Sequence, residues 1–157
     1  MQTSLTKTAY LLFTLLALGS WTLSVQAAPA AVPVSASPSP NAITVYQDPN
    51  CGCCAVWATH MRDAGFKVQT VQSADMVSVK RKLGVPQSLQ SCHTAVLAGS
   101  GQIVEGHVPA HVVRKLQTQP KVVGIAAPGM PLNAPGMGAL DGNLVTVDFA
   151  GKPFSRD

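Results

Sequence analysis

The chain has 157 residues, with 11 lysines and arginines against 7 aspartates and glutamates, and a formal net charge of +4. Aromatic residues make up only 5% of the sequence and the basic residues are scattered, which argues against nucleic-acid binding by base stacking. The one basic cluster, Lys80-Arg81-Lys82, is interpreted as a solvated helix end rather than a nucleic-acid-binding patch.

Residues 1–27 have the pattern of a secretory signal peptide. The first seven residues carry one lysine and no acid, an apolar run follows from Ala9 to Leu18, and Val25-Gln26-Ala27 is a small-x-small cleavage pattern. The alternative is a membrane anchor, but the apolar core is shorter than the roughly 20 residues that a membrane span needs. We therefore expect export to the periplasm and no stable membrane insertion after cleavage.

Residues 28–41 are rich in alanine, proline and serine, which predicts a flexible linker. Seven elements in the order β-α-β-α-β-β-α are predicted after it, from alternating apolar residues in the strands and from glycine and proline at the helix ends. They are expected at residues 43–47, 53–64, 66–72, 75–83, 94–98, 103–106 and 110–117. This order is that of an α/β, thioredoxin-like fold.

The composition changes after the third predicted helix. Pro128-Gly129-Met130 and Pro135-Gly136-Met137 form a short repeat, and Pro-Gly pairs make turns that hold each methionine out on a loop. Residues 144–149 alternate and predict one edge strand, and residues 152–157 are expected to be a tail. We therefore expect a domain over 42–137 that includes this methionine loop, and a C-terminal strand and tail over 138–157.

Three of the four cysteines lie on the predicted turn between the first strand and the first helix. Cys51, Cys53 and Cys54 are near a helix N-terminus, where the positive end of the helix dipole favours thiolate over thiol. In a thioredoxin-like fold the segment before the third strand packs beside this turn, so Cys92 is expected to join the other three. An exported protein with four cysteines would normally form two disulfides, but the adjacency of Cys53 and Cys54 argues against that arrangement.

Thiolates together with imidazoles and thioethers form a soft ligand set, which selects copper(I) over hard cations. Zinc would also accept four thiolates, although a zinc site usually draws on two separated pairs of cysteines. Three crowded thiolates around a single copper(I) ion leave excess negative charge, and bridging thiolates shared among several ions offset it. The sequence therefore favours a multinuclear, thiolate-bridged copper site over a single ion.

Two residues of the first predicted helix are further candidate ligands. His60 and Met61 lie seven residues after Cys53 and Cys54, so each shares a helix face with its cysteine. Seven residues rise about 10 Å along a helix, so neither easily shares one ion with that cysteine. Each is a candidate ligand for a neighbouring ion or an access route. The alternative is a half-buried histidine and a core methionine.

Four more candidates lie outside that helix. His107 follows the fourth predicted strand and is a candidate ligand, while His93 is adjacent to Cys92 and is expected to orient a ligand from behind it. Met130 and Met137 are candidate thioether ligands on the loop, because a neutral sulfur binds copper(I) without adding charge. The alternative for both methionines is that they fill a hydrophobic gap.

Four ordered motifs resemble the CopG-type periplasmic copper-resistance proteins, a family long catalogued only as a domain of unknown function. They are Cys-Gly-Cys-Cys-x2-Trp-x2-His-Met over 51–61, Ser-Cys-His-Thr-Ala over 91–95, Glu-Gly-His-Val-Pro over 105–109 and Pro-Gly-Met-Pro-x3-Pro-Gly-Met over 128–137. The resemblance implies a thioredoxin-like fold, a cysteine-bridged copper cluster and a role in copper detoxification, with redox interconversion of copper(I) and copper(II) as a further possibility.

The favoured function is therefore that of a periplasmic copper-binding resistance protein, with copper ions and other periplasmic copper-resistance proteins as expected partners. One alternative is a thiol-disulfide oxidoreductase, because Cys51 and Cys54 form a C-x2-C motif. Cys53 would compete within that motif, and Cys92-His93 stands where such enzymes carry a cis-proline. A second alternative is a copper chaperone that uses the methionine loop as its transfer arm. The sequence leaves open whether the protein is an enzyme.

Overall fold

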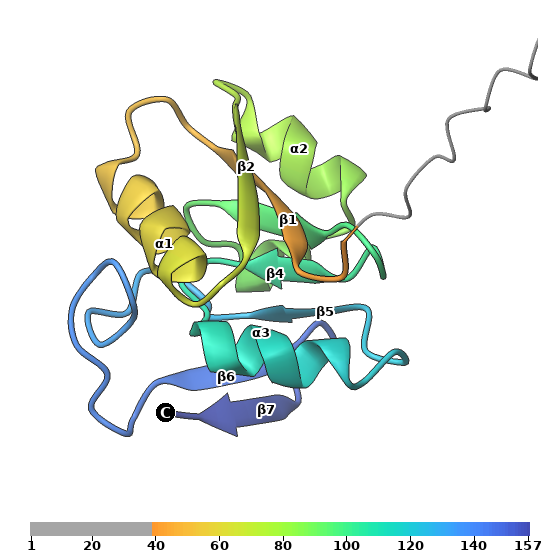
Figure 1. Cartoon of the computed structure of the whole chain (residues 1–157), viewed down its shortest axis with the longest axis vertical. Coiled ribbons are helices and arrows are strands. Elements are labelled where there is room, and N and C mark those ends of the chain that lie inside the picture. The colour runs from red at the N-terminus through yellow and green to blue at the C-terminus, as the bar shows by residue number, and fades with distance from the viewer. Residues whose placement is uncertain (1–38) are drawn as a thin grey trace, which may run out of the picture. The chain divides into compact units, whose positions relative to one another are not determined.

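The computed structural model describes residues 39–157, and the predicted signal peptide over 1–27 and the linker up to residue 38 lie outside the described residues. The described part is a mixed α/β unit built on one sheet (Figure 1), so the predicted α/β class is confirmed. Among residues 39–157, no helix combines the length and the hydrophobicity that crossing a membrane requires.

The predicted element order holds as far as the third helix, and the predicted boundaries agree closely with the observed ones. A short 3-10 helix, η1 (Gln87–Leu89), precedes the third strand. The other elements are β1 (Ala42–Gln47), α1 (Gly52–Asp63), β2 (Lys67–Gln72), α2 (Met76–Lys82), β3 (Thr94–Leu97), β4 (Ile103–Glu105) and α3 (Ala110–Gln117). The thioredoxin-like label remains an interpretation of this order.

Beyond α3 the chain adds three strands to the same sheet, where the sequence predicted one strand and a tail. They are β5 (Gly124–Ala126), β6 (Val145–Asp148) and β7 (Pro153–Arg156). The expected tail is wrong over β7, because this segment pairs antiparallel with β6 and takes the sheet edge that was predicted for β6. The sequence missed β5 because three fully buried residues are too few to show alternation.

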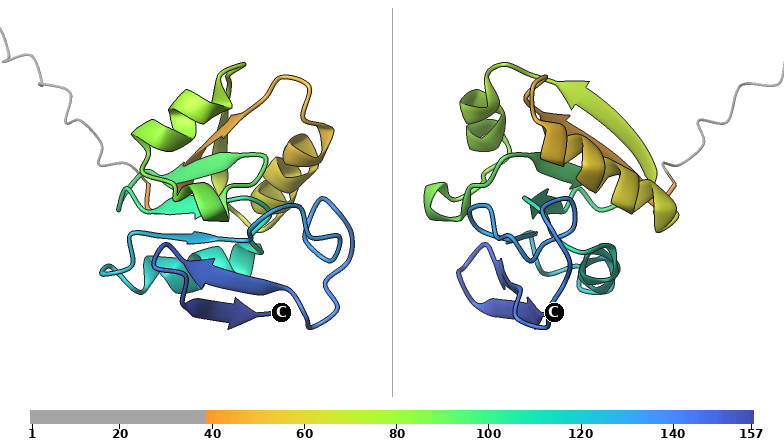
Figure 2. Two further views of the ribbon diagram at one scale, coloured as in Figure 1. Left: turned by 180° about the vertical axis from the view of Figure 1, so that it is seen from behind. Right: turned by 90° about the vertical axis from the view of Figure 1, so that its left-hand side faces the viewer.

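The seven strands follow the order β2-β1-β3-β4-β5-β6-β7. The β1–β2 and β4–β5 pairs are parallel, and the other neighbours are antiparallel. Helices α1 and α3 cover one face of the sheet and α2 lies against the other (Figure 2). The hydrophobic core is on the first of these faces, where Trp57 and Met61 of α1 and Leu116 of α3 are fully buried.

The register of β1, β3 and β4 brings three loops together at one end of these strands. Tyr46 near the end of β1 is opposite Thr94 at the start of β3, and Thr94 is opposite Glu105 at the end of β4. The turn after β1, the segment before β3 and the segment after β4 must therefore meet. Each of these segments carries cysteine or histidine.

Candidate metal centre

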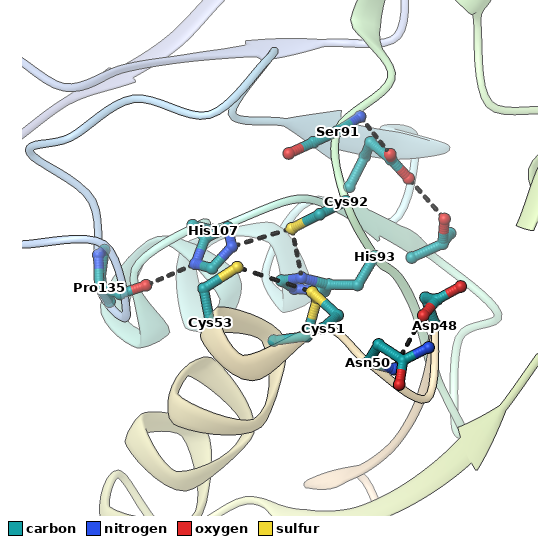
Figure 3. Close-up of a disulfide and its surroundings, with 12 residues drawn as sticks. Asp48, Asn50, Cys51, Cys53, Ser91, Cys92, His93, His107 and Pro135 are labelled. Carbon is teal, nitrogen blue, oxygen red and sulfur yellow. Dashed lines mark hydrogen bonds between the residues drawn. A yellow bond between two sulfur atoms is a disulfide. The ribbon is translucent and has the colours of Figure 1, made fainter.

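The four cysteines come together at the N-terminal end of α1, as the sequence predicted. Their sulfur atoms all lie within 4.8 Å of one another, and the Sγ atoms of Cys51 and Cys53 are 3.6 Å apart (Figure 3). Cys51 is the N-cap residue of α1, and the turn before it is fixed by Asp48, whose side chain accepts from the Asn50 N–H at 2.8 Å. Local turn geometry supplies three sulfurs, and the tertiary fold adds Cys92.

Cys51 and Cys54 form a disulfide, while Cys53 and Cys92 are free thiols. The first turn of a helix brings residues three apart onto one side, and the two Cα atoms are 5.4 Å apart, within the usual range for a disulfide. A disulfide cannot supply thiolates, so the structure describes the oxidised form of the cluster. Reduction is required before all four sulfurs can bind a metal ion.

His107 points its ring between Cys92 and the second Pro-Gly-Met turn. Its Nε2 lies 2.9 Å from the Sγ of Cys92, and its Nδ1 lies 2.7 Å from the carbonyl oxygen of Pro135 (Figure 3). Burial lowers the pKa of His107, which the hydrogen bond to Pro135 partly opposes, and a neutral ring is the form that binds metals. His107 is therefore suitably oriented to be a ligand beside Cys92.

His93 contacts the same sulfur and also the ring of His107. Its Nδ1 is 3.4 Å from the Sγ of Cys92, and its fully buried ring packs 4.3 Å from Trp57 and 4.9 Å from His107, measured between ring centroids. Burial lowers the pKa of His93 well below its usual value, with His107 adding to the effect. Cys92, His93 and His107 thus form a second group of donor atoms within 4.8 Å, and Cys92 belongs to both groups.

The two candidates near the C-terminal end of α1, His60 and Met61, have other contacts and do not join the cysteine cluster. His60 accepts a hydrogen bond at its Nε2 from the backbone N–H of Ala110, 3.2 Å away, which joins α1 to the start of α3. Met61 is fully buried in the hydrophobic core. In this arrangement both residues hold helices together, in line with the structural alternative.

Both Pro-Gly-Met turns are tied to the segments that carry the candidate ligands, and they are tied through their backbones. The Ser91 hydroxyl donates to the carbonyl of Gly129 in the first turn, and the Pro135 carbonyl of the second turn accepts from His107. The side chain of Met130 is 55% exposed, and that of Met137 is half-buried. The turns are therefore close to the site, whether or not their sulfur atoms bind a metal.

Sequence reasoning missed a buried ion pair behind the site. Lys80 was interpreted as part of a solvated helix end, but it is only 4% exposed and its Nζ lies 2.6 Å from Oε1 of Glu105. The fully buried Glu105 also accepts from the Ser91 N–H and the Thr94 hydroxyl, each at 2.6 Å. These two residues flank Cys92 and His93, so the ion pair holds the segment before β3 in place.

A signal for this pair was present in the sequence. Glu105 stands in a strand directly after the apolar residues Ile103 and Val104, and a buried carboxylate needs a cation or several hydrogen bonds. Lys80 lies four residues after Met76, on the inner stripe of its helix. Burial raises the pKa of Glu105, and the charge and hydrogen bond of Lys80 oppose that shift.

The free thiol of Cys92 is held in its protonated form. Burial raises its pKa to about 11, with the neighbouring Cys53 adding to the shift. A metal ion must displace this proton before the sulfur of Cys92 can bind the metal. The site can therefore take up a thiophilic metal ion, with release of protons, once the disulfide has been reduced.

Comparison with known proteins agrees with these observations. Residues 89–137, which include Cys92, His107 and both Pro-Gly-Met turns, match a family described as a protein of unknown function, DUF411. A solved structure of a copper resistance protein CopG, Form 1, is 43% identical with a TM-score of 0.67, over 76% of this chain and 98% of that chain. Form 2 is 43% identical with a TM-score of 0.65, over 74% and 97% respectively. No curated protein matches this chain.

The fold and the site define an α/β protein with a compact cluster of sulfur and imidazole donors. The chain belongs to the CopG-type family of copper-resistance proteins, as its four motifs predicted.

Proposed function

We propose that this protein is a periplasmic copper-binding protein of copper resistance, which holds copper(I) in a multinuclear site bridged by its cysteines. The observation that carries the proposal is that Cys92 belongs to both groups of donor atoms. It lies within 4.8 Å of the other three sulfurs and also within 4.8 Å of the donor atoms of His93 and His107. A thiolate shared between two donor groups is suited to bridge two ions.

The donor set fits copper(I) as cargo. Thiolates and imidazoles are soft or borderline ligands, and hard carboxylate oxygens are absent from both donor groups found among residues 39–157. Four clustered thiolates concentrate negative charge, which several monovalent ions offset better than one. Imidazole also suits copper(II), which supports the further proposal that the site interconverts the two oxidation states.

Loading depends on the oxidation state of the cysteines. Reduction of the Cys51–Cys54 disulfide takes two electrons and two protons from an external thiol reductant and yields two thiols. Disulfides persist in oxidising compartments, so this bond supports the periplasmic location that the predicted signal peptide also favours. The same location makes other periplasmic copper-resistance proteins the expected partners.

One observation favours a second candidate, a thiol-disulfide oxidoreductase. The Cys51–Cys54 disulfide occupies a C-x2-C motif at a helix N-terminus, which is the arrangement that such enzymes use. The free Cys53 thiol, 3.6 Å from the sulfur of Cys51, would compete for any mixed disulfide formed there. Copper binding is therefore the better supported function. The exposed side chain of Met130 is the feature that favours the chaperone alternative.

Metal analysis of the protein purified anaerobically from the periplasm of copper-fed cells tests the proposal. We expect more than one copper ion per chain, with all four cysteines reduced. A single ion per chain, or zinc in place of copper, would overturn the multinuclear copper site. Protein without metal that reduces a model disulfide substrate would instead establish the oxidoreductase.

A further inference from the structure

The second Pro-Gly-Met turn contacts the site through its main chain. A carbonyl oxygen can only accept a hydrogen bond, so the 2.7 Å contact with the Pro135 oxygen requires the proton of a neutral His107 ring to be on Nδ1. The Nε2 atom then has a free lone pair, and this atom is the one that lies 2.9 Å from the Sγ of Cys92. The Pro135 carbonyl thus fixes the proton on Nδ1, so that the nitrogen facing the cluster is the unprotonated one.

Gly136 explains how this carbonyl comes so close. Its φ is +86°, and a Cβ atom at this position would lie 2.9 Å from the carbonyl oxygen of Cys53 and 3.0 Å from the amide nitrogen of Trp57. It would also lie 3.2 Å from Nδ1 of His107. The first two neighbours are backbone atoms of α1, which cannot move aside as a flexible side chain can. Any residue other than glycine would therefore push the turn away from α1 and from His107.

We propose that the Pro135-Gly136 backbone is a positioning element of the metal centre, which fixes His107 as the Nδ1–H tautomer and directs its Nε2 lone pair towards Cys92. This proposal rests on the proposed copper-binding function and deepens it. Hydrogen-bond partners of this kind orient metal-binding histidines and raise their basicity. The Pro-Gly-Met motif then has a main-chain role that is independent of its methionine sulfur.

Two alanine variants test the steric part of the proposal. Gly142 has a φ of +82°, close to that of Gly136, but a Cβ there would meet nothing within 4 Å. Gly136→Ala and Gly142→Ala therefore carry similar backbone strain, and only Gly136→Ala displaces a turn from the site. We expect the affinity of the reduced protein for copper(I), measured by competition with a chelator, to fall about 10- to 100-fold in Gly136→Ala relative to Gly142→Ala. Equal affinities would overturn the proposal.

Two further measurements do not depend on the folding of Gly136→Ala. In the reduced wild-type protein, nitrogen-15 NMR should find the His107 proton on Nδ1, and a proton on Nε2 would overturn the proposal. Replacing Gly136 by glycolic acid turns the Pro135 carbonyl into a weaker ester acceptor without adding atoms, and we expect a loss of the Nδ1–H tautomer and weaker copper(I) binding. If the ester variant keeps the same His107 tautomer as the wild type, the proposal is also overturned. Failure of the wild-type protein to bind copper(I) would instead reject the proposed function.

Discussion

The sulfur of Cys92 lies 2.9 Å from Nε2 of His107, because Cys92 precedes β3, His107 follows β4 and the antiparallel pairing of these two strands brings the two segments together. The same sulfur lies 3.4 Å from Nδ1 of His93, and dashed lines in Figure 3 join it to both rings. Cys92 therefore links the other three cysteines to the imidazoles of His93 and His107. This position makes Cys92 the most informative residue to replace.

Cys92→Ser should lower the number of copper ions bound per chain, because it removes the one thiolate that both donor groups share. The measurement is the copper content of the reduced variant after equilibration with excess copper(I) and removal of loosely bound metal. A copper content equal to that of the wild type would show that Cys92 is not part of the site.

Reductant should be required for loading. Air-oxidised protein should titrate only the thiols of Cys53 and Cys92, and the reduced protein should titrate all four cysteines. Copper(I) uptake should rise in step, because a disulfide supplies no thiolate. Equal thiol counts before and after reduction would contradict this expectation and would also weaken the oxidoreductase alternative.

The methionines of the two turns are tested by Met130→Leu combined with Met137→Leu. Leucine and methionine have similar volumes, so the fold and the thiolate-bound copper should be retained. If the sulfur atoms serve the site, copper(I) affinity, the exchange rate with a chelator or the reduction potential should change. No change in any of the three would leave these methionines with a structural role alone.

Replacing Lys80 should destabilise the protein strongly, because the buried Glu105 would lose its cation. We expect Lys80→Met to lower the free energy of unfolding by about 3–5 kcal/mol, measured by urea denaturation. Lys82→Met places the same substitution at an exposed position of α2 and should change the free energy of unfolding by no more than about 0.5 kcal/mol.

A second variant separates charge from packing. Lys80→Met combined with Glu105→Gln removes both buried charges while keeping an acceptor for the Ser91 N–H. It should recover part of the lost stability. A double variant less stable than Lys80→Met would show that the unpaired charge of Glu105 is not the reason why Lys80→Met loses stability.

The stability of the reduced apo-protein should fall as the pH is lowered from 7 to 5. Burial lowers the pKa of His93, His60 and His107 in the folded state, so the unfolded chain binds more protons once the pH drops below about 6.5. Each such histidine contributes a slope of up to about 1.4 kcal/mol per pH unit, and the raised pKa of Glu105 acts in the opposite direction at lower pH.

The replacement His93→Gln checks this origin of the pH dependence, since it removes the histidine whose pKa burial lowers furthest. The slope of unfolding free energy against pH should become shallower in the variant, by up to the contribution of one histidine. An unchanged slope would mean that His93 does not contribute.

The sequence by itself determined the local part of the site. The spacing of Cys51, Cys53 and Cys54, together with the strand and helix around them, placed three thiols on one turn. The alternation of residues 43–47 and 66–72 and the glycine stops gave the elements as far as α3. These features depend on neighbours along the chain, so local propensity is enough to predict them.

Only the tertiary structure decided how distant residues meet. The strand register put His107 against Cys92. The packing of α2 on the sheet put Lys80 into contact with Glu105, which changed the interpretation of a basic triplet. The ring of His60 turned towards Ala110 rather than towards the cysteines. Periodicity identifies the face on which a side chain lies but not its partner, because the partner is fixed by packing between elements that are far apart in the sequence.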